Sequence, residues 1–181
     1  MRALRKLLPP CFLLLLLSGF AAAEERGIED FFGTYIGHAE SPEELGRDMS
    51  VTIGGVEGSD DFFVKWSTVI HKTDERTKRV TYNIRFTESH RQSIYVSAMA
   101  RNVFGKFVPL NPMQGDPLVW ARIKGDTLTV YAMIITDDGG FDMQVYDRTL
   151  NKDGLWLEFR RKKDDLPLKE ISAQLIRVSG Q

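Results

Sequence analysis

Hydrophobic and polar residues alternate with a period of two along most of this chain. In residues 47–53, for example, Met49, Val51 and Ile53 are separated by Ser50 and Thr52. Such alternation is typical of strands with one buried face, so the pattern predicts about ten strands. The alternating runs are residues 34–39, 47–53, 64–70, 80–86, 92–99, 118–124, 127–135, 142–149, 155–159 and 171–175.

Short turn sequences separate most of these runs, including Gly54-Gly55, Gly125-Asp126 and Asp153-Gly154. Short connections of this composition favour antiparallel hairpins. We therefore expect an all-β, up-and-down antiparallel β-barrel of about 8–10 strands, because closure removes the exposed edges of a long sheet. A β-sandwich is the alternative. Only residues 25–32 have helical spacing, which predicts a short N-terminal helix.

The register of one hairpin follows from its turn. A two-residue loop at Gly125-Asp126 pairs Lys124 with Thr127, which places Val119, Ala121 and Ile123 on one apolar, inward face. The opposite face should point outward although it is rich in apolar residues, and such a patch is typical of an interaction surface. The residues proposed for this outer patch are Trp120, Tyr131 and Met133.

Residues 102–117 have the prolines and glycines of a loop but also contain several apolar residues, among them Phe104 and Phe107. Connecting segments usually run over the surface, so these side chains need something to contact. Two roles are open. The segment could fold back over the outer patch, or it could close one end of the barrel as a lid over a ligand.

The N-terminus resembles a secretory signal peptide. A basic start precedes the apolar run Cys11–Leu17 and three alanines, so cleavage is expected after Ala23. Residues 1–23 are then the signal peptide and residues 24–181 a single lipocalin-like β-barrel domain. The rest of the chain contains no cysteine and no Asn-x-Ser/Thr site, which favours a bacterial periplasm over general secretion.

Charge and hydropathy narrow the possible partners. Removal of residues 1–23 leaves 21 basic and 25 acidic residues, a net charge of −4, which argues against nucleic acid as a partner. We expect no membrane span after signal removal, because no later apolar run is long enough.

Catalytic motifs are missing from the sequence. His38, His71 and His90 have no ligand-type spacing, so no metal site is expected, and no cofactor motif is present. The acidic pairs at 60–61, 137–138 and 164–165 fall in turns, and the basic run 160–163 is interpreted as a solvated strand end. The protein is therefore expected not to be an enzyme; a cluster of His38, an acid and Arg85 at one barrel mouth would revive that possibility.

The segment Phe32-Gly33-Thr34-Tyr35, after a short helix and at the start of the first strand, resembles the opening of lipocalins and fatty-acid-binding proteins. In those families a Gly-x-Trp motif occupies this position, and a basic residue near the end of the last strand lies against its aromatic ring. Arg177 matches the basic position, and Tyr35 stands in for the Trp, which is a departure from the motif. This lipocalin-like, calycin-type resemblance implies a meander barrel around an apolar ligand, with a cation stacked on the ring.

The sequence thus predicts an exported periplasmic barrel that binds a small apolar molecule in its interior, such as a lipid, a fatty acid or an isoprenoid-like compound. The expected ligand-binding residues are Tyr35, Trp66, Tyr82, Phe86, Phe104 and Phe107. The alternative is a non-enzymatic cell-envelope interaction module, in which the outer face around Trp120, Tyr131 and Met133 binds a protein partner.

Overall fold

The computed structural model describes residues 26–41, 44–97, 100–101, 107–108 and 110–180. The strands of its main sheet are β1 (Gly33–Ser41), β2 (Glu44–Gly55), β3 (Phe62–His71), β4 (Thr77–Glu88), β5 (Ile94–Ser97), β8 (Leu118–Lys124), β9 (Thr127–Ile135), β10 (Phe141–Asn151), β11 (Gly154–Lys163) and β12 (Leu166–Ser179). The remaining elements are the 3-10 turns η1 (Ile28–Phe31) and η2 (Pro112–Gln114) and the two short strands β6 (Ala100–Arg101) and β7 (Phe107–Val108).

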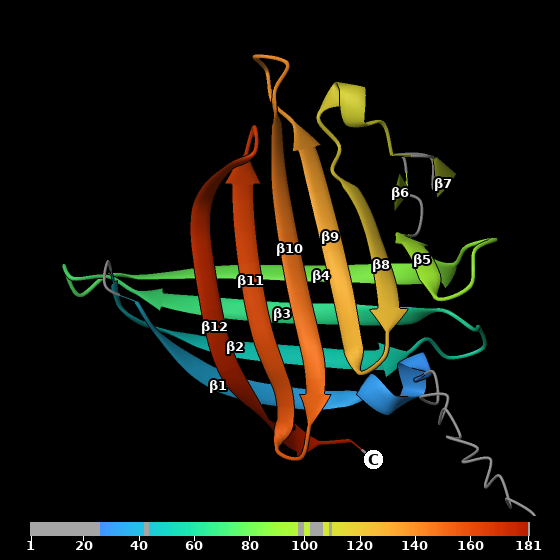
Figure 1. Ribbon diagram of the computed structural model, residues 1–181, viewed down its shortest axis with the longest axis horizontal. Helices are drawn as coiled ribbons and strands as arrows, with labels where there is room; N and C mark the ends of the chain where they lie inside the picture. Colours follow the sequence, from blue (N-terminus) through green and yellow to red (C-terminus); the bar gives the residue numbers. More distant parts are fainter. Residues whose placement is uncertain (1–25, 42–43, 98–99, 102–106, 109, 181) are drawn as a thin grey trace, which may run out of the picture.

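The ten strands of the main sheet close into an antiparallel barrel in the order β1-β12-β11-β10-β9-β8-β5-β4-β3-β2. Figure 1 shows β8–β12 crossing over β1–β4, so the barrel is flattened into two layers that join at both sides. Pairing of β1 with β12 and of β5 with β8 leaves the main sheet without a free edge. The predicted up-and-down barrel is confirmed, and the chain does not form the alternative sandwich.

The hairpin register predicted from Gly125-Asp126 is confirmed. Lys124 pairs with Thr127, and Gly125 has a φ of 54°, a left-handed conformation that glycine adopts without strain. Ala121 and Val130 pair and are fully buried. Alternation in this hairpin therefore points the apolar face inward, as the sequence indicates.

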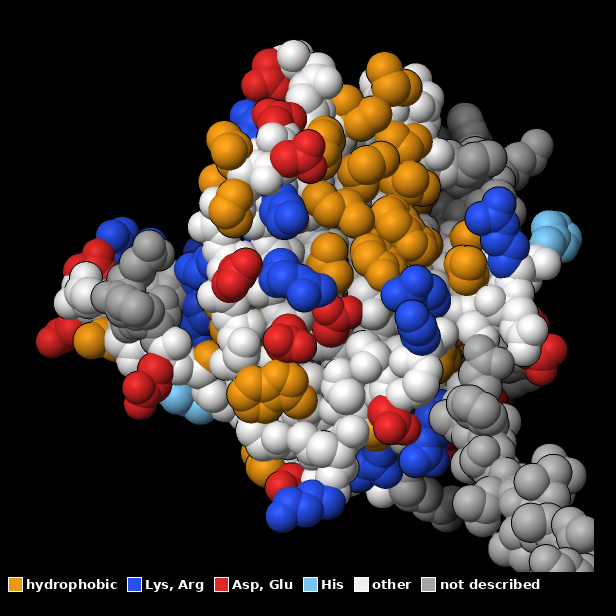
Figure 2. All heavy atoms as spheres, viewed as in Figure 1, with side chains coloured by type: hydrophobic (Ala, Val, Ile, Leu, Met, Phe, Trp, Pro, Cys, Tyr) orange, Lys and Arg blue, Asp and Glu red, His pale blue; other side chains and the backbone are white. Residues whose placement is uncertain are grey.

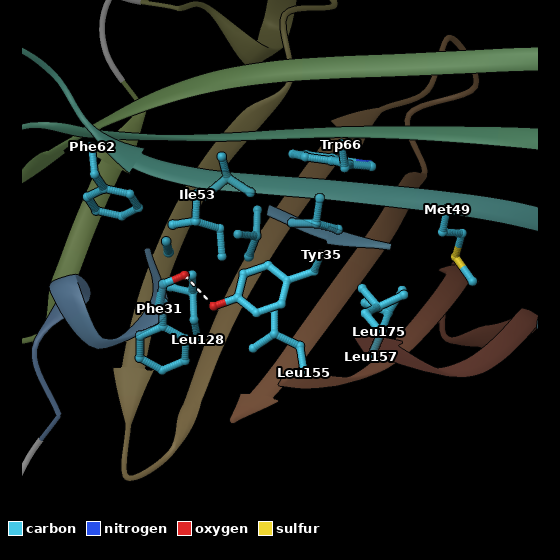
Figure 3. Packing of buried hydrophobic residues seen from close by; sticks show 14 of the residues in the cluster. Phe31, Tyr35, Met49, Ile53, Phe62, Trp66, Leu128, Leu155, Leu157 and Leu175 are labelled. Carbon is cyan, nitrogen blue, oxygen red and sulfur yellow. Dashed lines mark hydrogen bonds between the residues drawn. The ribbon is translucent and has the colours of Figure 1, made fainter. Parts of the chain in front are cut away.

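One half of the barrel interior is filled by apolar side chains, and we call it the filled half. Figure 3 shows part of this packing, with Leu128 and Leu155 close to the ring of Tyr35. The turn η1 closes this end, because Phe31 is fully buried and Ile28 almost so. The largest buried apolar side chains of the filled half are Phe31, Tyr35, Ile53, Phe62, Phe86, Leu128, Leu155 and Leu175.

The first and last strands are joined by the predicted cation–aromatic contact. The guanidinium carbon of Arg177 lies 5.1 Å from the centre of the Tyr35 ring, and Arg177 Nη2 donates a 2.7 Å hydrogen bond to the Tyr35 hydroxyl. That hydroxyl donates in turn to the carbonyl of Phe31 at 2.8 Å. The Tyr35–Arg177 contact therefore ties η1, β1 and β12 together where the barrel closes.

The N-terminal helix is shorter than predicted. Residues 28–31 form a single 3-10 turn, and Phe32 already has the extended φ and ψ of −61° and 136°. Only Ile28 and Phe31 enter the core, so one turn is enough to place both apolar side chains over the barrel end. The proposed signal peptide, residues 1–23, lies outside the described residues.

Candidate ligand-binding site

The second half of the barrel interior contains a pocket of about 300 Å³, which we call the interior pocket. Its walls come from β2, β3 and β4 on one side and from β10, β11 and β12 on the other. Trp66, which is 7% exposed and is labelled in Figure 3, belongs to the packed core cluster and also lines this pocket. The pocket volume falls at the lower end of the range for small-molecule sites.

A continuous series of aromatic rings lines the interior pocket. The ring centroid of Trp66 lies 5.0 Å from that of Tyr82 and 5.1 Å from that of Tyr146, and Tyr146 lies 4.7 Å from Phe159. Burial raises the pKa of the Tyr146 hydroxyl to about 12, so this group is neutral at physiological pH. The hydroxyl donates to Gln144 Oε1 at 2.9 Å, and the rings present a mainly apolar wall.

The same pocket is lined by basic side chains. None of the described residues in its wall is acidic, whereas five are basic. These are Arg47, Lys78, Arg148, Arg161 and Lys169. The interior pocket therefore combines aromatic walls with positive charge in a chain that is slightly acidic as a whole.

Arg148 is the most unusual of the five because its side chain is completely buried. It lies on β10 opposite Leu128 of β9 and Leu157 of β11, both of which point inward. Its guanidinium carbon is 5.2 Å from the centre of the Trp66 ring and 5.4 Å from that of Tyr146. These rings face the cation and stabilise it in part.

Burial changes the electrostatics of Arg148. Loss of hydration lowers the pKa of its guanidinium to about 10, which still leaves the group charged at neutral pH. Its Nε and Nη1 atoms have no hydrogen-bond partner among the described residues. Buried polar groups are nearly always hydrogen-bonded, so this side chain requires an explanation.

The other arginine of β10 and β11 that lines the pocket is paired. Arg161 Nε donates to Asp142 Oδ2 at 2.9 Å, and this hydrogen bond raises the pKa of Arg161. On the outer face, Arg160 forms an ion pair with Asp147. Strand alternation therefore divides the basic run 160–163: Arg161 reaches the pocket, whereas Arg160 is a solvated surface group.

The six predicted ligand-binding residues do not all meet. Trp66 and Tyr82 line the interior pocket. Tyr35 and Phe86 are instead fully buried in the filled half, where Tyr35 contacts Arg177 and Phe86 stacks on Phe62 at 5.2 Å. Neither of these two side chains lines the interior pocket.

The lid hypothesis concerned residues 102–117. Phe104 lies outside the described residues, and for Phe107 only the backbone is described, paired with Arg101. None of the described residues of this segment lines the interior pocket. Leu110 instead borders a surface groove beside Leu118 and Trp120, which agrees with a cover over the outer face.

The three residues proposed for the outer patch lie together on the outer face of β8 and β9. The Trp120 and Tyr131 rings stack at 4.8 Å with an interplanar angle of 10°, and Met133 pairs with Leu118 beside them. The patch continues onto β10, since Met143 pairs with Met133 and Val145 with Tyr131. Figure 2 shows the resulting apolar area above a mixed charged surface.

The remaining polar residues do not form the catalytic cluster considered from the sequence. His38 Nδ1 and His71 Nε2 contact the two carboxylate oxygens of Asp48 at 2.9 and 2.7 Å on the outer surface. Arg85 is not part of this group, because it pairs with Asp61 near the start of β3. The part of the chain that the structure describes has no group of three or more His, Cys, Asp or Glu placed to hold a metal ion.

Sequence reasoning missed Arg148, although a signal was present. A two-residue turn at Lys152-Asp153 pairs Asn151 with Gly154, and this register places Arg148 opposite Leu157. Leu155 and Leu157 belong to an apolar, inward-facing run, so the same register would have placed Arg148 inside the barrel.

Comparison with known proteins leaves the family of this chain open. No protein-family model matches the sequence, and no curated protein is significantly similar to it. Among the described residues, no helix has the length and apolar character needed to cross a membrane. The chain is an all-β protein whose closed, ten-stranded antiparallel barrel is compatible with a calycin-like architecture.

Proposed function

We propose that this protein binds a small, largely apolar molecule in the interior pocket and carries or senses it without catalysing a reaction. The observation that supports this most directly is the 300 Å³ space lined by Trp66, Tyr82, Tyr146 and Phe159. Transfer of an apolar surface from water to such walls is favourable by about 25 cal/mol per Å². Enclosure would therefore supply most of the affinity.

The size of the pocket limits the ligand. Because the filled half occupies the rest of the interior, a long acyl chain cannot lie along the whole barrel. A short fatty acid, a small isoprenoid-like molecule or one end of a longer lipid fits this volume better. This limit distinguishes the proposal from a barrel that is hollow throughout.

We place the protein in the bacterial periplasm, exported by a cleaved signal peptide. The support is the sequence of residues 1–23 together with the lack of cysteine in the rest of the chain. The lipocalin-like assignment is part of the same proposal, supported by the barrel and the Tyr35–Arg177 contact.

A neutral fluorescent probe, N-phenyl-1-naphthylamine, tests enclosure directly. We expect the emission of the probe to rise when it is mixed with the purified protein. The variant Ile171→Trp, whose larger side chain fills the interior pocket, should abolish that rise. The matched control is Ile176→Trp on the outer face of the same strand, where the side chain is 47% exposed. Equal probe binding by both variants would refute binding in the interior pocket.

Native mass spectrometry of the protein purified from its own periplasm complements the probe. A discrete additional mass that is released by solvent would identify the bound molecule. If the protein instead carries no additional mass and no lipid added back binds, the carrier proposal fails.

A second candidate function uses the outer patch. Leu118 is 42% exposed and continues the stacked Trp120–Tyr131 pair, and an apolar sheet face of this kind fits an envelope protein with a complementary apolar surface. Trp120→Glu should then abolish binding to that protein and leave the fold and interior probe binding unchanged. Loss of folding in Trp120→Glu would instead assign Trp120 a structural role.

A further inference from the structure

The buried charge of Arg148 is the feature of the interior pocket that enclosure of an apolar molecule does not explain. A guanidinium has five N–H donors. The one at Nε and the two at Nη1 have no acceptor among the described residues, although the side chain is fully buried. Placing such a group inside a barrel is unfavourable unless an acceptor meets it.

Protein groups offer Arg148 little compensation. The Trp66 and Tyr146 rings, at 5.2 and 5.4 Å, stabilise the cation but do not accept its N–H groups in the plane of the guanidinium. The neighbouring acid, Asp147, is turned to the outer face, where it accepts from Thr129 at 2.6 Å and pairs with Arg160. The charge of Arg148 is therefore directed at the interior pocket rather than at a carboxylate of the chain.

The charges around Arg148 point to the same conclusion. Lys78, Lys169 and Arg47 also line the pocket, Arg161 lines it while paired with Asp142, and none of the described wall residues is acidic. A cavity lined by one sign of charge with low-dielectric walls concentrates ions of the opposite sign. The aromatic rings between these cations provide contacts for an apolar group that accompanies such an ion.

We propose that the ligand of the interior pocket is an organic anion, with a carboxylate or phosphate that accepts hydrogen bonds from Arg148 and a compact apolar body against the aromatic rings. This inference rests on the proposed function and specifies its ligand. Carboxylate and phosphate are the groups that an arginine recognises best. A pocket of about 300 Å³ holds roughly ten water volumes of about 30 Å³ each, so the body is small.

Four probes with the same ten-carbon chain distinguish the contribution of ligand charge to affinity from that of apolar enclosure. They are decanoate, decyl phosphate, decanol and decylamine. Each is titrated by calorimetry below its critical micelle concentration. A charge-assisted hydrogen bond contributes enough to change affinity roughly tenfold to a hundredfold. We expect decanoate and decyl phosphate to bind at least tenfold more tightly than decanol, and decylamine to bind least tightly.

Arg148→Met keeps most of the side-chain volume and removes the charge. We expect it to reduce the affinity for decanoate to that for decanol and to change decanol binding less than about threefold. Arg122→Met, at an exposed position on the outer face of β8, is the matched control and should leave all four affinities unchanged. If Arg148→Met does not fold, Arg148→Lys replaces it in the test. Lysine keeps the positive charge but lacks the planar set of N–H donors, so the affinity of Arg148→Lys for decanoate should be severalfold lower than that of the unmodified protein.

The outcomes separate the two proposals. If decanol binds as tightly as decanoate and Arg148→Met changes neither, the anion inference is overturned and enclosure stands. If inorganic phosphate alone binds as tightly as decyl phosphate and decanol does not bind, the anion site stands and enclosure of an apolar body is overturned. If none of the probes binds, both are overturned.

Discussion

The filled half and the interior pocket are built from the same strands by the same alternation, yet they differ in chemistry. Along the inward face of β10, Leu150 packs against the core of the filled half, Arg148 follows at the boundary, and Tyr146 and Gln144 then line the pocket. One half is closed by η1 and packed with aliphatic and aromatic side chains. The other exposes rings and cations to a cavity.

This contrast shows how one barrel separates stability from binding. Apolar residues packed without voids stabilise the fold, whereas buried donors without acceptors cost stability and remain available to a ligand. Truncation of a side chain in the filled half should therefore lower the free energy of unfolding, whereas removal of the buried Arg148 charge should raise it.

The largest expected effect is in the filled half. Leu128→Ala should lower the free energy of unfolding by about 2–5 kcal/mol, because Leu128 is fully buried and its truncation leaves a cavity. Ile171→Ala, in the pocket wall, should cost less because its side chain already borders an open space. Urea denaturation of both variants measures the difference. Equal losses would mean that the pocket is packed as tightly as the core.

The second effect has the opposite sign. Arg148→Met should raise the free energy of unfolding by about 1–3 kcal/mol, because it removes unpaired buried donors and retains an apolar side chain of similar length. Urea denaturation without added ligand is the measurement. A stability loss of the size expected for Leu128→Ala would show that Arg148 belongs to the structural core.

The contact that closes the barrel should contribute less. Tyr35→Phe retains the ring beneath Arg177 but removes the hydroxyl that bonds both Arg177 and the Phe31 carbonyl. A loss of about 1–2 kcal/mol is expected in thermal or urea unfolding, since one buried polar group then lacks its partner. Ligand affinity should not change, because Tyr35 does not line the interior pocket.

The smallest effect is expected at the outer surface. Hydrogen bonds from His38 and, to a smaller extent, from His71 lower the pKa of the exposed Asp48 carboxyl. At Arg148, inside the barrel, it is burial that lowers the pKa. The stability that Asp48 contributes is present above its unfolded pKa of about 3.9 and is lost as pH falls through the lower, folded pKa. His38→Ala should move the Asp48 pKa back toward its ordinary value in a carboxyl NMR titration. An unchanged pKa would mean that this hydrogen bond does not form in solution.

Much of the fold could be predicted from the sequence because its signals are local. The turn at Gly125-Asp126 determines the register of β8 and β9, and the alternation in residues 47–53 determines which side of β2 is buried. Alternation also places Trp66 and Tyr82 inside the barrel, where both line the interior pocket. The predicted length of the N-terminal helix was wrong, because packing against the end of the barrel determines where the 3-10 turn η1 ends.

The limit of sequence reasoning is clearest at Tyr35, Phe86 and Arg148. Alternation places all three inside the barrel but does not determine their height along its axis. Tyr35 and Phe86 lie in the filled half, whereas Arg148 lines the interior pocket. Height depends on how the strands are staggered around the whole closed sheet, a property of all ten pairings together.

The sequence by itself determined the strands, their antiparallel order and the inward face of each, because side chains in a strand alternate with a fixed period and short turns fix neighbouring registers. Only the tertiary structure decided that Trp66 on β3 and Arg148 on β10 meet across the interior. These strands are not neighbours in the sheet, so no local pattern relates them. Closure of the barrel brings them together and creates the charged, aromatic pocket.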